Sequence, residues 1–206
     1  MPEKVTDELI EFLNHPDWEH RFLAAKRLAG PAGKNEFRAR LSKEQTQIRK
    51  RLVALLEDSS PQVRMQCAAA LGTLGCREAV EPLMTALADP NEWVRVQVAE
   101  AIGKLGNPFI AHALAQHLEA ETETHVRATM VRALGRIGDE KVAPFLVIYL
   151  EDKDGRVRAN SVEALAQLKT GKAALKQAFM KLVDDPSNRV RANVAMSLFS
   201  IGEEKG

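Results

Sequence analysis

An arginine recurs at nearly constant intervals along the chain, and this periodicity restricts the possible folds more than any other feature. From the second occurrence onward the intervals are 31, 32, 31 and 33 residues, and the first interval is 43. Valine directly precedes five of the six arginines, which are Arg21, Arg64, Arg95, Arg127, Arg158 and Arg191. A period near 30 residues predicts that each unit is one supersecondary block, which buries its apolar face only by stacking on its neighbours.

The segment 79–106 shows what one unit contains. Apolar residues at a spacing of three and four predict a first helix, and these are Val80, Leu83, Met84 and Leu87. The sequence Asp89-Pro90-Asn91-Glu92 predicts the start of a second helix, with Asp89 as its cap and Pro90 at its first position. The second helix is expected to end at Gly106. Each unit is therefore predicted to be a pair of antiparallel helices.

The second helices of several units carry a glycine in their interior. An interior glycine costs about 1 kcal/mol relative to alanine, yet one recurs at Gly72, Gly103 and Gly135. This recurrence predicts that a neighbouring helix comes too close there for a larger side chain. The periodicity divides the chain into repeats at about 5–30, 42–75, 77–106, 108–138, 140–171 and 172–202, with an insertion at 31–41.

An acidic residue precedes each of the last five arginines by six positions. Together with an alanine-rich second helix and endings such as Ile102-Gly103-Lys104-Leu105-Gly106, this pattern resembles the HEAT repeat family, in the short form named for phycobilisome lyases. The resemblance implies one all-α solenoid over 1–206, an α-α superhelix of about six antiparallel helix pairs. It also implies a structural ladder in which each arginine bridges the acidic residue of its own turn and that of the next unit. The ladder residues are Asp58, Arg64, Asp89, Arg95, Glu121, Arg127, Asp152, Arg158, Asp185 and Arg191.

In HEAT-like proteins the second helices line a concave binding surface, so their outward positions are the candidate site. Two positions after the arginine, uncharged polar residues are expected to hold a peptide backbone, namely Gln66, Gln97, Thr129, Asn160 and Asn193. Two positions before it, Trp93 is the expected apolar anchor, and His125 occupies the same place in the next unit. Arg136, Arg156 and Arg189 are expected to select an acidic peptide. The alternatives are that Trp93 packs over Gln97 and that the arginines are solvated.

The charge balance disfavours nucleic acid as a partner. The formal net charge is +1, so no field of the whole molecule attracts a polyanion. The segment 34–51 carries a local excess of positive charge. It is either a patch that binds nucleic acid or an anionic surface, or it is the solvated side of an amphipathic helix. The sequence therefore favours another protein or an acidic peptide as the partner. The alternative is that this chain is a HEAT-like nucleic-acid-binding protein.

No residue pattern indicates catalysis, a metal or a cofactor. None of the five histidines is followed directly by a glutamate, and the sequence contains no phosphate-binding loop or nucleophile elbow. Cys67 and Cys76 are expected to be reduced thiols in a cytoplasmic protein, about 13 Å apart by helical rise and too distant for a disulfide. No signal peptide or membrane span is expected. We therefore expect a non-catalytic adaptor, with a bilin lyase or isomerase as the alternative that the resemblance implies.

The last unit differs from the others at its exposed positions. Eight positions after the arginine, Phe199 replaces a glycine or alanine, and Met196 occupies a mostly polar position. We expect Phe199 to cover the open end of the core in a monomer. The alternative is an exposed apolar patch of Phe199 and Met196 that pairs two molecules end to end.

Overall fold

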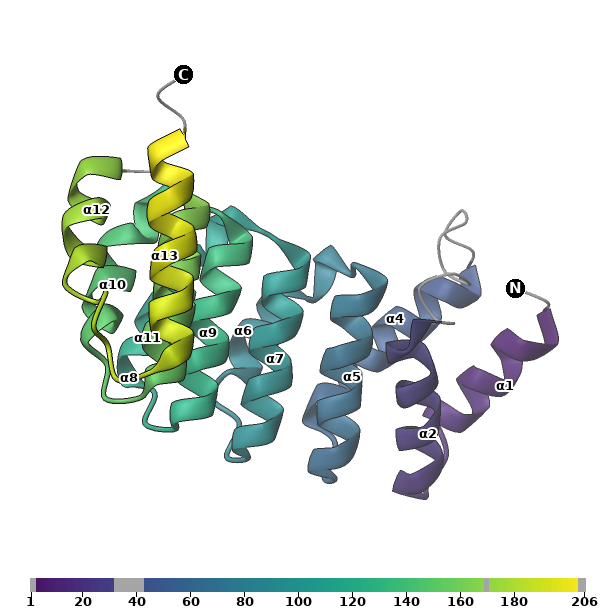
Figure 1. The fold of residues 1–206 in the computed structure, drawn as a ribbon. Helices are drawn as coiled ribbons and strands as arrows, with labels where there is room; N and C mark the ends of the chain where they lie inside the picture. The colour runs from purple at the N-terminus through teal and green to yellow at the C-terminus, as the bar shows by residue number, and fades with distance from the viewer. Residues whose placement is uncertain (1–2, 32–42, 169–170, 204–206) are drawn as a thin grey trace. The chain divides into compact units, whose positions relative to one another are not determined.

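The computed structural model describes residues 3–31, 43–168 and 171–203, and within these ranges every regular element is a helix (Figure 1). The first helices of the pairs are α1 (Glu3–Leu13), α4 (Lys43–Ala54), α6 (Val80–Ala86), α8 (Ala111–Ala120), α10 (Ala143–Ile148) and α12 (Lys172–Met180). The second helices are α2 (Trp18–Ala29), α5 (Pro61–Leu74), α7 (Glu92–Leu105), α9 (Thr124–Ile137), α11 (Gly155–Leu168) and α13 (Asn188–Glu203). The predicted all-α fold of helix pairs is confirmed.

Short 3-10 helices extend or precede several first helices. They are η1 (Leu55–Glu57), η2 (Arg77–Ala79), η3 (Pro108–Ile110), η4 (Glu140–Val142) and η5 (Tyr149–Glu151). The predicted insertion at 31–41 lies outside the described residues except for Pro31. Among the helices that the structure describes, none combines the length and apolar character needed to cross a bilayer.

The chain divides into two compact units, each larger than a single repeat. The first unit is residues 1–105 and the second unit is residues 106–206. In the first unit α5 packs against both α2 and α7, and in the second α11 packs against both α9 and α13. Within each unit the second helices therefore form a layer in chain order (Figure 1). The valine before each repeated arginine is fully buried in this packing, at Val63, Val94, Val126, Val157 and Val190.

Glycine allows adjacent second helices to approach closely, as predicted. A Cβ atom added at Gly72 would lie 2.7 Å from the Cα of Ala101, on the next second helix. A Cβ atom at Gly135 would lie 2.7 Å from the Cβ and 2.8 Å from the Cα of Ala164. The position eight after the arginine thus contacts the position six after the next arginine, and both must be small.

We predict that Gly135→Ala destabilises the protein although alanine is the better helix former. Helix propensity favours the substitution by about 1 kcal/mol, but the new methyl group would overlap the backbone of α11. Because overpacking of this kind costs about 1–3 kcal/mol, we expect a net loss of stability in urea unfolding. Ala166→Gly, at the equivalent position of α11, is the control and should cost only the propensity difference. A Gly135→Ala protein at least as stable as the wild type would contradict the close approach.

Arginines of the ladder join consecutive repeats within each unit. Arg158 donates from Nε and Nη2 to the two carboxylate oxygens of Asp185, both at 2.8 Å, and from Nη1 to the backbone carbonyl of Asp152. Arg64 binds Asp89 and the carbonyl of Asp58 in the same way. The predicted contact to the acidic residue of the same turn therefore uses its carbonyl oxygen, while the carboxylate comes from the next repeat.

The ladder includes one pair that the sequence pattern did not indicate. Arg21 donates to both carboxylate oxygens of Asp58, at 2.6 and 3.1 Å, and to the carbonyls of His15 and Pro16. The first repeat has His15 in place of the acidic residue six positions before the arginine, but the carbonyl contact does not require an acidic side chain. At the other end Arg191 donates to the carbonyl of Asp185.

The acidic residues of the ladder also shape the loops before the second helices. The Oδ1 atom of Asp89 accepts the N–H of Asn91, and Asp58, Asp152 and Asp185 make the equivalent bond two residues on. The prediction that Asp89 caps α7 is wrong, because its carboxylate is engaged by Arg64. Asn91 is the cap instead, accepting the N–H groups of Trp93 and Val94.

We predict that Arg158→Ala lowers the free energy of unfolding by about 1–3 kcal/mol, because it leaves the carboxylate of Asp185 buried without its cation. Arg156→Ala on the same helix is the matched control. Arg156 pairs with Asp154 at the surface, and exposed pairs contribute about 0–1 kcal/mol. Equal unfolding midpoints for the two variants would contradict a structural role for the ladder.

The same pair predicts a loss of stability in acid. Hydrogen bonds from Arg158 lower the pKa of Asp185 below its ordinary value of 3.8, against the opposing effect of burial. A carboxylate with a lowered pKa stabilises the fold above its ordinary pKa, and this contribution disappears as the pH falls through the folded-state value. We expect Asp185→Asn to be less stable than the wild type at neutral pH, with the difference shrinking below about pH 4 in circular-dichroism titrations. A difference that is constant with pH would contradict this.

The last second helix leaves its outer face open. The Phe199 side chain is 66% exposed and that of Met196 is 72% exposed. The prediction that Phe199 covers the end of the core is therefore wrong. The ring lies on the outer face of α13, whereas the core-facing side of that helix is formed by Val190, Val194 and Ser197.

Candidate protein-binding surface

Trp93 lies in the first turn of α7 with its side chain 55% exposed. It lines a groove of about 210 Å³ together with Pro61, Gln62, Met65 and Asn91. Asn91 fixes the start of α7 by accepting the Trp93 N–H at 3.0 Å, so the backbone that carries the indole is held in place. The structure thus presents a large aromatic side chain beside an apolar floor, within the first unit.

The polar residues predicted to hold a peptide backbone are engaged inside the protein in the second unit. The amide of Asn160 is buried and donates to the carbonyl of Ala128 on α9 at 2.7 Å. The hydroxyl of Thr129 is buried and donates to the carbonyl of His125. The prediction is therefore wrong for Thr129 and Asn160, because burial and these hydrogen bonds remove them from a partner's reach.

The remaining members of the predicted row are partly accessible. Asn193 is half-buried and donates to the carbonyl of Ala159 on α11 at 2.9 Å, which repeats the Asn160 contact one helix later. Gln66, Gln97 and His125 are also half-buried. The two asparagines of the row, Asn160 and Asn193, thus bridge to a carbonyl of the preceding second helix, which is a structural use of this position.

The predicted arginines differ in how much of their charge is balanced. Arg156, which was expected to select an acidic peptide, forms an ion pair with Asp154 at 3.0 Å, so its charge is balanced within the chain. Arg136 is exposed, and Arg189 is exposed while donating to the Oδ1 atom of Asn160 at 2.8 Å. Burial lowers the pKa of Arg132, and the positive charges of Arg136 and Arg189 lower it further, with Glu163 acting in the opposite sense. Arginine side chains of α9 and α13 therefore lie within electrostatic range of one another.

A larger groove of about 420 Å³ lies between α11 and α13 in the second unit. Its lining residues are Glu163, Ala166, Gln167, Asn193, Met196, Ser197 and Ser200. Sequence reasoning placed Met196 and Asn193 on an exposed surface but did not combine them with α11. Two features of the sequence point to this groove. Ala166 replaces the interior glycine on α11, and the large apolar Met196 occupies a mostly polar position on the facing helix α13.

The first-helix side of the first unit also carries a groove, of about 630 Å³. It is lined mainly by apolar residues of α4, η1 and α6, with the exposed side chains of Glu57 and Glu81 at its edge. Sequence reasoning considered only the second helices and therefore missed it.

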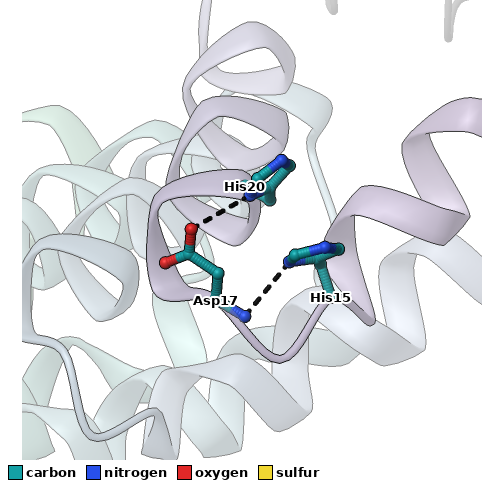
Figure 2. Close-up of side chains that lie close together, drawn as sticks. All are labelled: His15, Asp17 and His20. Atoms are coloured by element: carbon teal, nitrogen blue, oxygen red, sulfur yellow. Dashed lines mark hydrogen bonds and ion pairs between the residues drawn. The ribbon is translucent and has the colours of Figure 1, made fainter.

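A compact polar cluster joins the loop between α1 and α2 to the first turn of α2, as Figure 2 shows; its members are His15 and Asp17 of the loop and His20 of the helix. The Nδ1 atom of His15 accepts the Asp17 N–H at 3.1 Å, and the Nδ1 atom of His20 lies 3.2 Å from the Asp17 carboxylate. The two imidazole rings stack with their centroids 3.8 Å apart and their planes at 28°. Ligand atoms of the three residues lie within 4.8 Å of one another, which is close enough to raise the question of a metal site.

The geometry of this cluster fits a structural role better than a metal. A histidine binds a metal along the lone pair in its ring plane, at about 2.0–2.1 Å for zinc. Stacked rings direct these lone pairs side by side, so they do not converge on one ion. The backbone N–H of Glu19 lowers the pKa of Asp17, which caps α2. We therefore assign the cluster to closing the loop and to the start of α2.

The basic segment 34–51 is only partly described, from residue 43 onward. Arg49 lies 3.4 Å from Glu78, and Arg51 donates from Nε to the carbonyl of Leu13. Two of its arginines thus connect α4 to neighbouring elements. This favours the interpretation of the segment as one side of a packed helix over a nucleic-acid patch.

Cys67 and Cys76 are free and fully buried. Burial raises the pKa of the Cys67 thiol strongly and that of Cys76 to about 12. Both are therefore protonated and inert at neutral pH, as expected for structural thiols.

Comparison with solved structures finds helical repeat proteins. The complex of CpcE and CpcF of phycocyanin lyase from Nostoc sp. PCC7120 matches with 25% identity and a TM-score of 0.69, over 98% of this chain and 79% of that one. A designed armadillo repeat protein in complex with the peptide (KR)4 matches with 21% identity and a TM-score of 0.70, over 94% and 98% of the two chains. An engineered protein matches with 21% identity and a TM-score of 0.70, over 97% of each chain.

No curated protein matches the chain. The family described as HEAT repeats matches residues 48–121 and 110–198, which is well over half of the chain. These are the residues that carry most of the arginine ladder and the close helix contacts at Gly72 and Gly135. The chain belongs to the HEAT repeat family.

Proposed function

We propose that this protein is a non-catalytic binding module that holds a segment of a partner protein against the outward side of its second helices. The observation that carries the proposal is the position of Trp93, more than half exposed beside the groove of Pro61, Gln62 and Met65. A tryptophan gives a large apolar contact at a low cost in conformational entropy and is favoured as a binding anchor.

The surroundings of Trp93 support an apolar side chain as its ligand. Pro61 and Met65 supply the apolar wall, and Met is well suited to adapt to different shapes. Gln62 and Asn91 at the edge can hydrogen-bond to the backbone on either side of the inserted residue. The groove volume of about 210 Å³ suits one or two side chains rather than a folded domain.

We further propose that the second unit, taken by itself, favours an acidic segment as its ligand. Arg136 and Arg189 are exposed, and the charged form of Arg132 is disfavoured electrostatically by both. A carboxylate placed among them would relieve this repulsion and form charge-assisted hydrogen bonds. The similar designed armadillo repeat protein is in complex with the peptide (KR)4. For the present chain the arginines favour the opposite charge, with an on-rate that falls as salt is added.

The lyase alternative has one observation in its favour, the likeness to the CpcE and CpcF complex over nearly the whole of this chain. A direct assay distinguishes it: the purified protein is incubated with a bilin and an apo-phycocyanin subunit, and covalent chromophore is measured by absorbance after denaturation. Chromophore attachment above the uncatalysed level would replace the binding proposal with the enzymatic one.

A cytoplasmic site of action is part of the same proposal. Its support is that both cysteines are free, which suits a reducing compartment. Fractionation of the source cells, followed by detection with an antibody, would test this location.

We predict that Trp93→Ala weakens partner binding by about 2 kcal/mol or more, roughly 30-fold in affinity. The partner would be captured from a lysate of the source organism on the immobilised wild-type protein, identified by mass spectrometry, and titrated against each variant by calorimetry. The unfolding midpoint should be nearly unchanged, since the side chain is mostly exposed.

Trp18→Ala is the matched control, because Trp18 is also a partly exposed tryptophan in the first turn of a second helix. It should bind the identified partner like the wild type. Equal affinity of wild type and Trp93→Ala for that partner would remove Trp93 as the anchor.

A further inference from the structure

The outer face of α13 carries an exposed apolar stripe. Ala192, Ala195, Met196 and Phe199 are all exposed and follow one another at intervals of three, one and three residues. This spacing places them on one side of the helix, over two turns. Phe199 and Met196 are among the most exposed large apolar side chains of the second unit.

Three of these four positions, those of Ala192, Ala195 and Phe199, are packing positions in the internal second helices. In α9 the residues one, four and eight after the arginine are Ala128, Val131 and Gly135, and all three are buried. Gly135 lies directly against Ala164 of the following second helix. In α5 the residues four and eight after the arginine, Ala68 and Gly72, are likewise buried. Ala192, Ala195 and Phe199 on α13 thus occupy the face with which internal repeats contact the next helix. Met196 lies beside them, five positions after the arginine, and also lines the groove between α11 and α13.

A second copy stacked head to tail does not fit this face. In the internal contacts the incoming helix offers alanine six positions after its arginine, at Ala101 and Ala164. The corresponding residue of α2, the first second helix, is the exposed Arg27. Phe199 in place of a glycine would meet this charged side chain where the internal contacts require two small residues.

A two-fold arrangement fits the stripe by size. When two α13 helices pair antiparallel about a point between positions 195 and 196, position 199 of one copy faces position 192 of the other. Position 196 then faces position 195. Phe199 is placed on Ala192 and Met196 on Ala195, so each large side chain meets a small one. Alternation of large and small residues across facing helices is what close packing requires.

We propose that two copies of this protein associate through the Ala192–Ala195–Met196–Phe199 face of α13, antiparallel about a two-fold axis. This surface is distinct from the Trp93 groove, so the association does not depend on the proposed binding function. A contact of one helix per copy is well below the roughly 800 Å² per partner of stable complexes. We therefore expect a weak dimer with a dissociation constant on the order of 10–100 μM.

Sedimentation velocity of the full chain from about 5 to 500 μM, a range that brackets this dissociation constant, tests the proposal. The wild type should shift from the monomer toward the dimer mass across this range. Phe199→Ser should remain monomeric at every concentration, with an unchanged thermal midpoint because the ring is exposed. Phe109→Ser is the matched control: Phe109 is 93% exposed in the same unit but lies outside the stripe, so this variant should dimerise like the wild type. A wild type that stays monomeric, or a Phe199→Ser variant that dimerises equally, would overturn the proposal.

A cysteine cross-link tests the two-fold geometry separately. The two copies of position 195 flank the proposed axis, so Ala195→Cys should give a disulfide-linked dimer on mild oxidation. The native Cys67 and Cys76 are buried and do not compete. Ala120→Cys, at an exposed position at the end of α8, is the control and should remain monomeric. Equal cross-linking of both variants would show random collision and would contradict the specific pairing.

Discussion

The bidentate contact between an arginine and the aspartate of the next repeat fixes how successive helix pairs stack. Arg158 reaches Asp185 with two nitrogens while its third donates to the carbonyl of its own loop, and Arg64 does the same with Asp89. A planar fork with both acceptors specified allows little rotation between the repeats. The aspartate in turn accepts a backbone N–H of its own loop, so one carboxylate sets both the stacking of the repeat and the path into its second helix.

This arrangement explains why a charged residue is tolerated at the edge of a core. Removing an isolated charge from water is expensive unless it is paired and its hydrogen-bonding groups are satisfied. The guanidinium of Arg158 meets both conditions, since its donors reach Asp185 and the carbonyls of Asp152 and Lys153. The valine on its N-terminal side is fully buried. The repeated Val-Arg pair therefore places a core residue and an inter-repeat clamp on adjacent positions of one helix.

Sequence reasoning recovered the features that repeat and failed where one residue serves two purposes. The period, the helix pairs and the close approach at Gly72 and Gly135 follow from spacing and side-chain volume, which the sequence states directly. The role of Asn160 does not, because an amide at an outward helical position is equally suited to a ligand and to the carbonyl of Ala128. The prediction that Asp89 caps α7 was wrong for the same reason. A carboxylate before a helix is well suited to cap it, but the carboxylate of Asp89 binds Arg64, 25 residues earlier in the chain. Arg156 was expected to bind an acidic partner, but Asp154, which belongs to the preceding loop rather than to the helical face, pairs with it.

The side chains that are already engaged in contacts within the protein determine which surfaces remain for function. Internal second helices place small residues against the next helix, and the amide of Asn160 binds the preceding one, while the hydroxyl of Thr129 binds a carbonyl of its own helix. Neither polar group is available to a partner. What remains outward is the first turn, where Trp93 stands, and the long side chains that extend past the contacts, such as Arg136 and Arg189. At α13 the corresponding contact positions hold Ala192, Ala195 and Phe199, so a phenylalanine takes the place of the glycine or alanine of the internal helices. An internal repeat with Phe199 at the glycine position would push its neighbour away, so this helix is compatible with a different packing partner and not with another closely stacked repeat of the internal type.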